Sequence, residues 1–232
     1  MHPQLPHVLT REQVRDVDHR AIHQYGMTGL VLMENAGRNA ASLLVQLGAK
    51  GPVVICCGKG NNAGDGFVMA RHLQNAGLEV CVLLSVPARD FQGDAAANYQ
   101  ILSRSDIPII APPDADMESA WYQKLATADW VVDALLGTGT QGTIREPFVS
   151  AIAAINKSGR PVLAVDLPSG MDCDTGLPLG CCVQATHTAT FVAQKPGFSS
   201  PVGKAAVGTV HVIDIGVPRK LLLELIPVTK SS

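Results

Sequence analysis

The sequence lacks any block of lysine or arginine residues, and its formal net charge is −2 with a pI near 6.4. Without such a block, we expect no binding to nucleic acid and none to anionic membrane surfaces, because both attract basic patches. Aromatic residues are scarce at 4%, but apolar residues reach 47%, so the chain can bury a sizeable aliphatic core. These proportions exclude a largely disordered chain.

Long apolar runs are also missing. The longest ones have the length of a strand, well short of the roughly 20 residues that a membrane-spanning helix needs. The first ten residues, MHPQLPHVLT, lack the basic flank and apolar centre of a signal peptide. We therefore expect a cytoplasmic protein.

Zinc-binding cysteine spacing is absent too. Six cysteines occur as two adjacent pairs and two single residues, without a C-x-x-C arrangement. A chain with this much core does not need a disulfide framework, and free cysteines fit a reducing compartment. We expect Cys56, Cys57 and Cys81, which lie in apolar runs, to be buried.

The sequence does contain a regular alternation of helix and strand patterns. Two helices are expected first, one from a Thr10–Gln13 capping box to Gly26 and one from Thr28 to near Gly48. Strands are then expected at 52–58, 79–84, 107–110, 130–137 and 161–170, alternating with helices at 64–77, 93–105, 117–128 and 145–159. Two further strands, at 185–193 and 208–216, follow with no clear helix between them.

This alternation predicts an α/β fold of three layers, in which helices cover both faces of a mainly parallel sheet. The last two strands are expected at one end of that sheet. Since no repeat, low-complexity tract or linker interrupts the pattern, we expect a single domain over residues 1–232.

Three of the expected strands end in a polar turn that contains aspartate: VVICCGKGNNAGDG, WVVDALLGTGTQG and VLAVDLPSGMD. In an open α/β sheet, turns at the carboxyl ends of the strands build the ligand crevice. The topology therefore places one set of polar residues on a common rim: Asn61, Asn62, Asp65, Asp133, residues 137–143, Asp166 and Ser169.

The first of these turns precedes a helix, whose N-terminal N–H groups favour an anion. It does not match the usual G-x-G-x-x-G fingerprint of dinucleotide sites, and it lacks the Gly-Lys-Ser/Thr of nucleoside-triphosphate loops, which disfavours phosphoryl transfer. Asp65 is unexpected there, because two like charges about 4 Å apart cost on the order of 4 kcal/mol. Either Asp65 caps the helix, or it accepts ribose hydroxyls while a cation offsets its charge.

The stretch GTGTQGT, residues 137–143, is either a second phosphate-binding loop or an ordinary Gly/Thr turn. Asp133 lies inside an apolar run and needs a partner, because burying a lone carboxylate is costly. That partner is either a hydrogen-bonding group or a hard cation held by Asn62, Asp133, Ser169 and turn carbonyls.

Asp166 is followed by the rigid turn Leu-Pro-Ser-Gly. It is placed for acid–base work or for stabilising a positive charge, unless it merely forms a turn with its own backbone. His187 and His211, in expected strands, are more typical of structural histidines than of catalytic ones. Lys195 lies at a strand end, where we expect a solvated lysine.

Seven stretches in register resemble one family: MENAG, GKGNNAGDGFVMARHL, VVDALLGTG, REPF, AVDLPSGMD, TATFVAQKPG and GTVHVIDIGVP. They are similar to the NAD(P)H-hydrate epimerase family, also called the YjeF N-terminal domain, from about residue 10 to residue 218. The resemblance implies a Rossmann-like three-layer αβα sandwich, usually a homodimer. It also implies interconversion of the R and S forms of hydrated NADH and NADPH, with one potassium ion per subunit.

The resemblance also implies the site residues. The hydrated nicotinamide nucleotide would contact Asn61, Asn62, Ala63, Gly64, Asp65, Gly137, Thr138, Gly139, Thr140, Gln141, Gly142, Thr143 and Asp166. Potassium would be held by Asn62, Asp133 and Ser169. Our hypothesis is that Asp166 carries the acid–base chemistry at the hydrated ring carbon, through an iminium or through ring opening.

Two residues depart from the family pattern. That pattern commonly reads Asn-Asn-Gly-Gly-Asp-Gly, and this chain has Ala63 at the first of those glycines. A positive φ at alanine would cost about 1 kcal/mol or more, so we expect an ordinary conformation there. Gln141 stands where some relatives have a lysine, so no catalytic lysine is expected at that point, and Lys195 is a distant candidate to compensate.

The main alternative is a non-catalytic module of the same fold that binds a nucleotide ligand or acts as a scaffold, because a fold does not guarantee chemistry. Retention of Asp65, Asp133 and Asp166 favours the enzyme. A small dehydrogenase is disfavoured, since no catalytic Tyr-Lys or His pair is evident. In bacteria this domain is often fused to a dehydratase that consumes the S hydrate. The chain has no room for that domain, so we expect the dehydratase to be a separate protein.

Overall fold

The computed structural model describes residues 7–111 and 117–225. Seven strands form one sheet in the order β3-β2-β1-β4-β5-β6-β7, and all neighbouring strands pair in parallel. Their bounds are β1 (Val53–Cys57), β2 (Val80–Leu84), β3 (Ile109–Ile110), β4 (Trp130–Ala134), β5 (Val162–Val165), β6 (His187–Phe191) and β7 (Thr209–Ile213). The predicted α/β fold is confirmed, with the last two strands at one end of the sheet.

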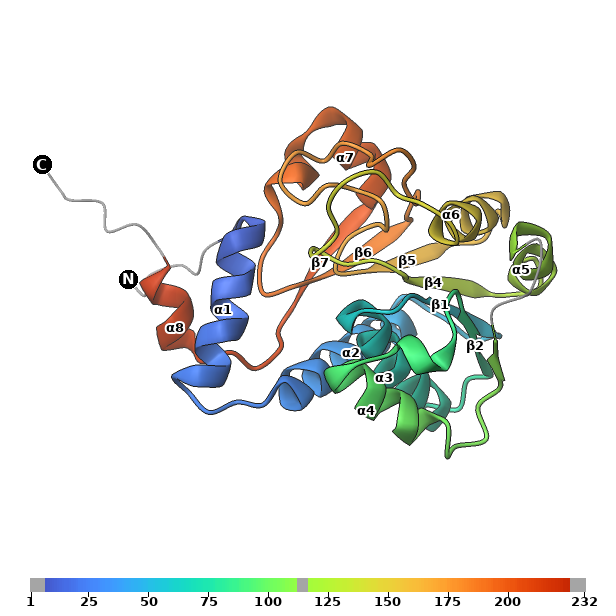
Figure 1. Ribbon diagram of the computed structural model, residues 1–232, viewed down its shortest axis with the longest axis horizontal. Helices are drawn as coiled ribbons and strands as arrows, with labels where there is room; N and C mark the ends of the chain where they lie inside the picture. Colours follow the sequence, from blue (N-terminus) through green and yellow to red (C-terminus); the bar gives the residue numbers. More distant parts are fainter. Residues whose placement is uncertain (1–6, 112–116, 226–232) are drawn as a thin grey trace, which may run out of the picture.

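Helices cover both faces of this sheet (Figure 1). One face carries α2 (Gly29–Gln46), α3 (Asn61–Asn75) and α4 (Gly93–Leu102), and the other carries α5 (Met117–Leu125) and α6 (Phe148–Lys157). Successive side chains of a strand point to opposite faces, so β1 contributes Ile55 to one apolar core and Val54 to the other. Burial on both sides explains why the strands read as continuous apolar runs.

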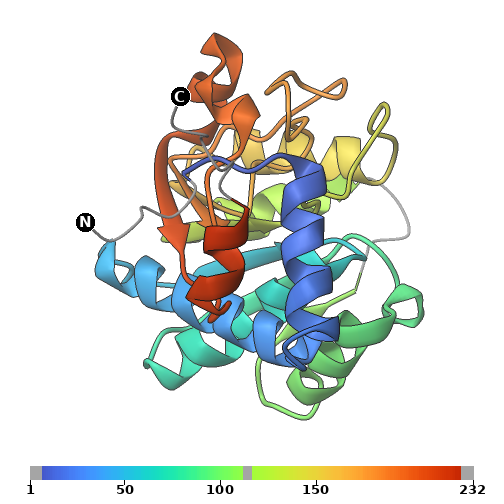
Figure 2. The same cartoon turned by 90° about the vertical axis from the view of Figure 1, so that its left-hand side faces the viewer.

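The two predicted N-terminal helices are present, and their caps follow the sequence. In α1 (Arg11–His23), the side chain of Thr10 accepts the Gln13 N–H while the Gln13 side chain accepts the Thr10 N–H. Gly26 follows with a φ of +70°, which allows the chain to leave the helix. Figure 2 shows α1 in front of the sheet beside α8 (Arg219–Glu224), and Arg20 forms an ion pair with Glu224.

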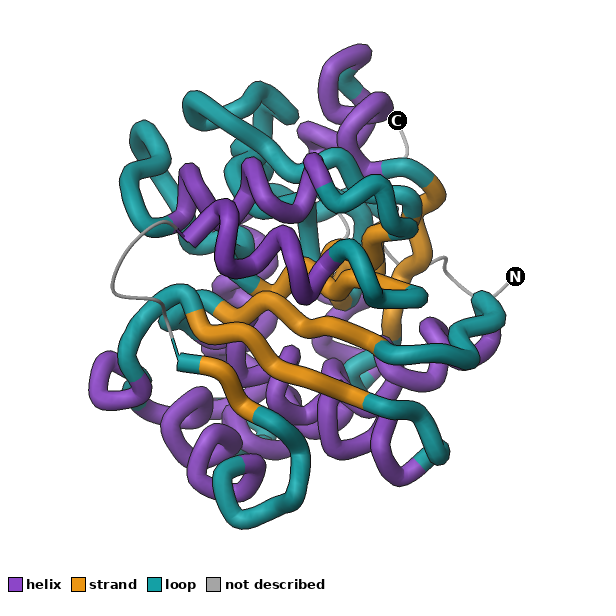
Figure 3. The backbone as a smooth tube through the Cα atoms, turned by 90° about the vertical axis from the view of Figure 1, so that its right-hand side faces the viewer, coloured by secondary structure: helices purple, strands orange, loops and turns teal. Residues whose placement is uncertain are grey.

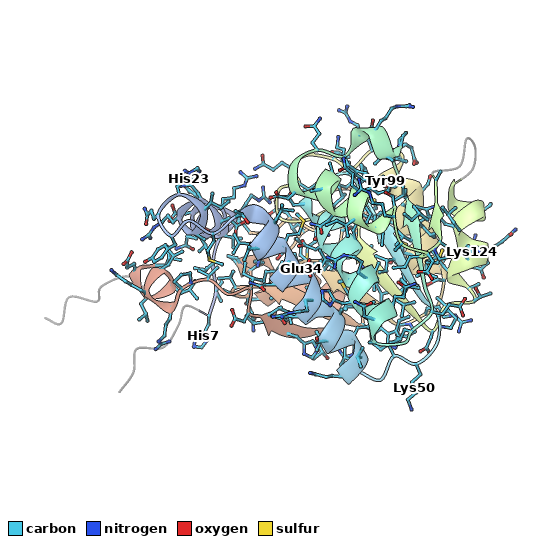
Figure 4. All side chains as sticks on the ribbon, turned by 90° about the horizontal axis from the view of Figure 1, so that it is seen from below. His7, His23, Glu34, Lys50, Tyr99 and Lys124 are labelled. Atoms are coloured by element: carbon cyan, nitrogen blue, oxygen red, sulfur yellow. The ribbon has the colours of Figure 1, made fainter. Side chains whose placement is uncertain are left out.

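Helices α2 and α3 pack closely against each other and are joined by a three-residue ion cluster. The carboxylate of Glu34, labelled on α2 in Figure 4, lies 2.5 Å from Nη2 of Arg71 and 2.7 Å from Nε2 of His72 on α3. Helix α3 follows β1 in the chain, so its first residues lie at the carboxyl edge of the sheet. The ion cluster therefore helps to hold this helix in position.

The segment between β6 and β7 differs from the prediction. A short helix, α7 (Pro201–Val207), follows the 3₁₀ helix η2 (Pro196–Ser199), whereas no helix was expected there. Ser200 caps α7 by accepting the Gly203 N–H, and Pro201 occupies the first helical position. Seven residues make about two turns, too few to establish a helical hydrophobic period in the sequence.

Several predicted strands also end earlier than expected; β5 stops at Val165 and a tight turn follows. Figure 3 shows the strands as one twisted layer between helices, with the loops gathered at the strand ends.

Within the described ranges, no helix combines the length and apolarity needed to cross a membrane. Cys56 and Cys57 are buried as predicted, Cys81 is only partly buried, and all six cysteines are free thiols.

Candidate active site

The helix that follows β1 begins earlier than predicted. α3 starts at Asn61, not at Gly64, and its N-cap is Gly60, which has no side chain to cap it. Residues 61–65 are therefore part of the helix and not a loop. Asp65 lies inside α3 and is only 8% exposed, so the interpretation of Asp65 as a helix cap is wrong.

A cavity of about 760 Å³ lies at the carboxyl edge of the sheet, beside β1 and β4, where the strand order reverses. This volume lies in the range of small-molecule and cofactor sites. The predicted residues that line it are Asn61, Asn62, Asp65, Gly137, Thr138, Gly139, Thr140, Gln141, Thr143 and Asp166. The convergence expected from topology is thus present in the structure.

Other predicted residues lie near the cavity but do not line it. Ala63 belongs to the apolar core between α3 and the sheet, and it has the ordinary helical conformation that we expected. Gly64 packs against α2, where a Cβ would come within 2.4 Å of the Met33 sulfur. Gly142, Asp133 and Ser169 are likewise outside the cavity lining.

The cavity also contains charged residues that sequence reasoning missed. Carboxylates come from Asp18 on α1 and Asp94 on α4, and cations come from Arg15 on α1, Lys59 and Arg145. Helices α1 and α4 contribute to the site through tertiary packing and not through a strand end, so the rule that located the other residues gave no signal for them.

Asp133 is completely buried and has hydrogen-bonding partners within the protein. Its carboxylate accepts the Ser169 N–H at 2.8 Å, the Ser169 hydroxyl at 2.6 Å and the Leu135 N–H at 3.3 Å. Burial raises the pKa of Asp133 to about 6, although these hydrogen bonds act in the opposite direction. This carboxylate therefore holds together the turns that follow β4 and β5.

The residues expected to hold potassium have suitable chemistry. Asn62 Nδ2 is buried without a hydrogen-bond partner in the described structure, and the Asn62 amide lies against Gly137 in the turn after β4. An amide oxygen, a carboxylate and a hydroxyl form the all-oxygen donor set that hard cations prefer. No group of three or more His, Cys, Asp or Glu residues gathers as a metal site in the described ranges, so such a site needs amide and hydroxyl oxygens.

Asp166 and Lys195 form a buried ion pair at the floor of the cavity. Lys195 is 0% exposed and its Nζ lies 3.1 Å from Oδ1 of Asp166, so the expectation of a solvated lysine is wrong. Asp166 is 7% exposed and has a φ of +67°, in the left-handed region. By contrast, His187 and His211 contact each other across β6 and β7, with ring nitrogens 3.1 Å apart, away from the cavity lining.

Two further carboxyl groups interact electrostatically with Asp166. Burial, followed by the charges of Asp166 and Asp18, raises the pKa of Asp65 well above its ordinary value. Desolvation by the surrounding protein, followed by the negative charge of Asp166, raises the pKa of Asp18 to about 6, although Asp18 remains exposed to solvent. Carboxyl groups whose environments differ in this way can divide acid and base roles between them.

The sequence matches the family described as YjeF-related protein N-terminus over residues 29–197. This chain belongs to that family. Over 221 residues it is 48% identical to the NAD(P)H-hydrate epimerase of Pirellula staleyi, covering 95% of this chain and 97% of the relative. It is 44% identical to the NAD(P)H-hydrate epimerase of Rhodopirellula baltica, covering 94% and 88% of the two chains.

Longer proteins carry the same YjeF-related unit. The bifunctional NAD(P)H-hydrate repair enzyme Nnr of Moorella thermoacetica is 38% identical, with 93% of this chain matching 42% of that protein. Among solved structures, the crystal structure of the yeast protein ynu0 has a TM-score of 0.79 at 23% identity and covers 92% and 91% of the two chains, so it shares the fold. The family match begins at Gly29, and α1, with Arg15 and Asp18, precedes it.

Proposed function

We propose that this protein is an NAD(P)H-hydrate epimerase, an isomerase that interconverts the R and S forms of hydrated NADH and NADPH. The observation that carries the proposal is the cavity at the carboxyl edge of the sheet, with the carboxylate of Asp166 on its floor. Relatives that match nearly all of this chain bear the same name. A non-catalytic module of this fold would have no need for the carboxyl groups of Asp18, Asp65 and Asp166 around one ligand cavity.

The reaction requires a proton donor, a proton acceptor and tolerance of positive charge. In the hydrate, a hydroxyl is bonded to the ring carbon next to the ring nitrogen. When this C–O bond breaks, its electron pair leaves with the hydroxyl, which takes a proton and departs as water, and the nitrogen lone pair stabilises the iminium. Addition of water to the opposite face, with loss of a proton, gives the other epimer; ring opening and reclosure is a second route. We assign the proton transfer and the stabilisation of the cation to Asp166.

The charges around the cavity support one orientation of the substrate. The carboxyl groups of Asp18 and Asp65 interact with that of Asp166, where the ring would become cationic, and the cations Arg15, Lys59 and Arg145 also line the cavity. The phosphates of the dinucleotide would therefore lie near these cations, the loop 137–143 and the first turn of α3, whose N–H groups favour anions. Asp65 would accept hydroxyl groups of the ligand.

One potassium ion per subunit would be held by Asn62, Asp133 and Ser169. When bound, it would supply a fixed positive charge between the first turn of α3 and the turns after β4 and β5. The unpartnered Nδ2 of Asn62 and the buried carboxylate of Asp133 support this assignment. We further propose a cytoplasmic homodimer that works with a separate NAD(P)H-hydrate dehydratase, in line with the bifunctional names of longer relatives.

The proposal is tested by adding the protein to a mixture of R and S hydrates together with a dehydratase that accepts only the S form. We expect the wild-type protein to allow complete consumption, because R is converted to S as S is removed. Stalling once S is exhausted would favour the non-catalytic module. Asp166→Asn should stall while still binding the hydrate, and the matched control Asp106→Asn, at an exposed position, should consume the mixture fully. Normal turnover by Asp166→Asn would remove Asp166 from the mechanism.

A further inference from the structure

Lys195 is buried beneath the cavity floor and is absent from the cavity lining. Its Nζ donates to the carbonyls of Phe191 at 2.9 Å and Ala193 at 3.0 Å, and lies 3.1 Å from Oδ1 of Asp166. These three acceptors match the three N–H bonds of an ammonium group. A buried ammonium needs such complete pairing, so this is the geometry of a charged lysine.

Two tight turns of the same kind end the adjacent strands β5 and β6. In each, the residue after the central one donates its N–H to the carbonyl of the residue before it, at 2.9 Å around Asp166 and at 2.8 Å around Val192. Both central residues have a φ of +67°, and in the described ranges they are the only non-glycine residues with a positive φ. A γ-turn with a positive central φ is rare and strained, and the cost is greatest for a β-branched residue such as valine.

Lys195 connects these two turns. The carbonyls that it binds, those of Phe191 and Ala193, lie on either side of Val192, and its third contact is the carboxylate of Asp166. The Phe191 N–H also lies 3.5 Å from the same carboxylate oxygen, Oδ1. Within the described residues, Oδ2 accepts no hydrogen bond. One oxygen of Asp166 is thus fixed by the protein and the other is left for the cavity.

The charges facing Asp166 come from several elements. Asp18 approaches from α1 and Asp65 from α3, and the thiol of Cys173 belongs to the loop after β5. The carboxyl groups of Asp18 and Asp65 lie within electrostatic range of Asp166, whereas the side chain of Lys195 pairs with it directly. Lys195 therefore supplies the positive charge that balances this acidic floor.

We propose that Lys195 is a positioning residue of the epimerisation. By pairing with Oδ1 and joining the two γ-turns, it holds the carboxyl group of Asp166 in place and presents Oδ2 to the hydrated ring carbon. This inference rests on the proposed function. Lys195 does not contact the substrate, because Asp166 and the turn around Val192 separate it from the cavity, and its effect passes through Asp166.

The first test is Lys195→Met, which keeps the length of the side chain without its charge, measured with the S-specific dehydratase as the coupling enzyme. We expect kcat to fall about 100-fold or more, as for loss of an acid–base group, while KM changes less than about threefold. The control Lys204→Met, at an exposed lysine on α7, should leave kcat and KM unchanged.

A double-mutant cycle separates this role from a merely structural one. If Lys195 acts through Asp166, then Lys195→Met should cost nothing further in an Asp166→Asn background. Equal losses of kcat in both backgrounds would overturn the proposal. Lys195→Gln retains two N–H donors without the charge, so it should fold and still lose kcat at a nearly unchanged KM, and a wild-type kcat in that variant would also overturn the proposal.

The outcomes distinguish this inference from the proposed function. If the wild-type protein fails to epimerise, or if Asp166→Asn is fully active, then the proposed function or its mechanism fails. If Asp166→Asn is inactive but Lys195→Met keeps the wild-type kcat, only the role of Lys195 is refuted. Should neither Lys195 variant fold, a crystal structure of the wild-type protein decides the matter: Nζ of Lys195 is expected within hydrogen-bonding distance of Oδ1 of Asp166, and a wider separation would refute the proposal.

Discussion

Asp65 places a nearly buried carboxyl group near the start of α3, close to the charges of Asp166 and Asp18. Its raised pKa means that the folded protein holds a proton that the unfolded chain releases near pH 4. The resulting contribution to stability is complete below that pH and is lost as pH rises through the raised pKa. We therefore expect Asp65→Asn to have a higher Tm than the wild type at pH 8, and a smaller difference in Tm between pH 5 and pH 8.

The same substitution should weaken function while it stabilises the fold. Replacing the carboxyl group that binds the ligand hydroxyls by a carboxamide should raise KM about tenfold to a hundredfold. Thermal unfolding at the two pH values and coupled kinetics measure both effects, with Asp106→Asn as the control that should change neither. A lower Tm at pH 8 in Asp65→Asn would contradict the assignment of a destabilising buried charge.

The two residues that depart from the family pattern have different surroundings. Ala63 adds a methyl group to the core between α3 and the sheet, in an ordinary helical conformation, so this site requires no glycine. Gln141 is exposed and lines the cavity. The lysine that contacts Asp166 at the floor of this site is Lys195, which comes from the buried segment after β6 and not from the loop 137–143.

At the scale of elements, the crossing of α2 and α3 determines where Asp65 lies. Gly37 marks the closest approach: a Cβ there would come within 2.5 Å of the Val68 Cβ and 2.7 Å of the Asp65 carbonyl oxygen. Neither atom can move alone, because one is backbone and the other is the root of a β-branched side chain. We expect Gly37→Ala to force the helices apart, lowering the free energy of unfolding by about 1 to 3 kcal/mol.

Since Asp65 moves with α3, Gly37→Ala should also reduce kcat/KM, although Gly37 does not line the cavity. Urea unfolding and coupled kinetics are the measurements. Ser42→Ala, at an exposed position on the same helix, should change the free energy of unfolding by less than about 0.5 kcal/mol. If Gly37→Ala matches Ser42→Ala in both measurements, the close crossing does not position the site.

Local signals explain why most elements could be predicted from the sequence. The capping box at Thr10 and the glycine at position 26 fix the ends of α1 through neighbouring residues alone. The start of α3 could not be read in this way, because Gly60 caps it without a side chain and residues 61–63 resemble a turn. Helix α7 was missed because it spans only seven residues.

At the scale of the whole molecule, the rim of the cavity was predictable because parallel strands bring their carboxyl ends to one edge. The contribution of α1 was not, since it depends on how that helix docks. Arg11 donates to Asp172 at 2.7 Å and its backbone N–H donates to Asp174, which ties the start of α1 to the loop after β5. The burial of Lys195 is equally a tertiary effect, because its charge is balanced by Asp166 from another strand.

Docking of α1 brings the cation Arg15 to the lining of the cavity, and its position leads to a prediction. Nη2 of Arg15 lies 4.0 Å from the position that a Cβ on Gly139 would occupy, so the guanidinium stands beside the loop 137–143. A phosphate bound by that loop would accept a charge-assisted hydrogen bond from Arg15. We expect Arg15→Gln to raise KM about tenfold or more, with kcat changed less than about threefold, because the phosphates lie away from the reacting ring carbon.

Ionic strength provides the second measurement, since salt screens charges that are open to solvent. KM of the wild type should rise between about 0.05 and 0.5 M salt, and the rise should be smaller in Arg15→Gln, which has already lost one of the charges that salt screens. Arg104→Gln, at an exposed arginine outside the cavity lining, should behave like the wild type. An unchanged KM in Arg15→Gln would contradict the proposed contact with the phosphates. A fall in kcat without a change in KM would indicate that Arg15 acts on the ring, which would reverse the proposed orientation.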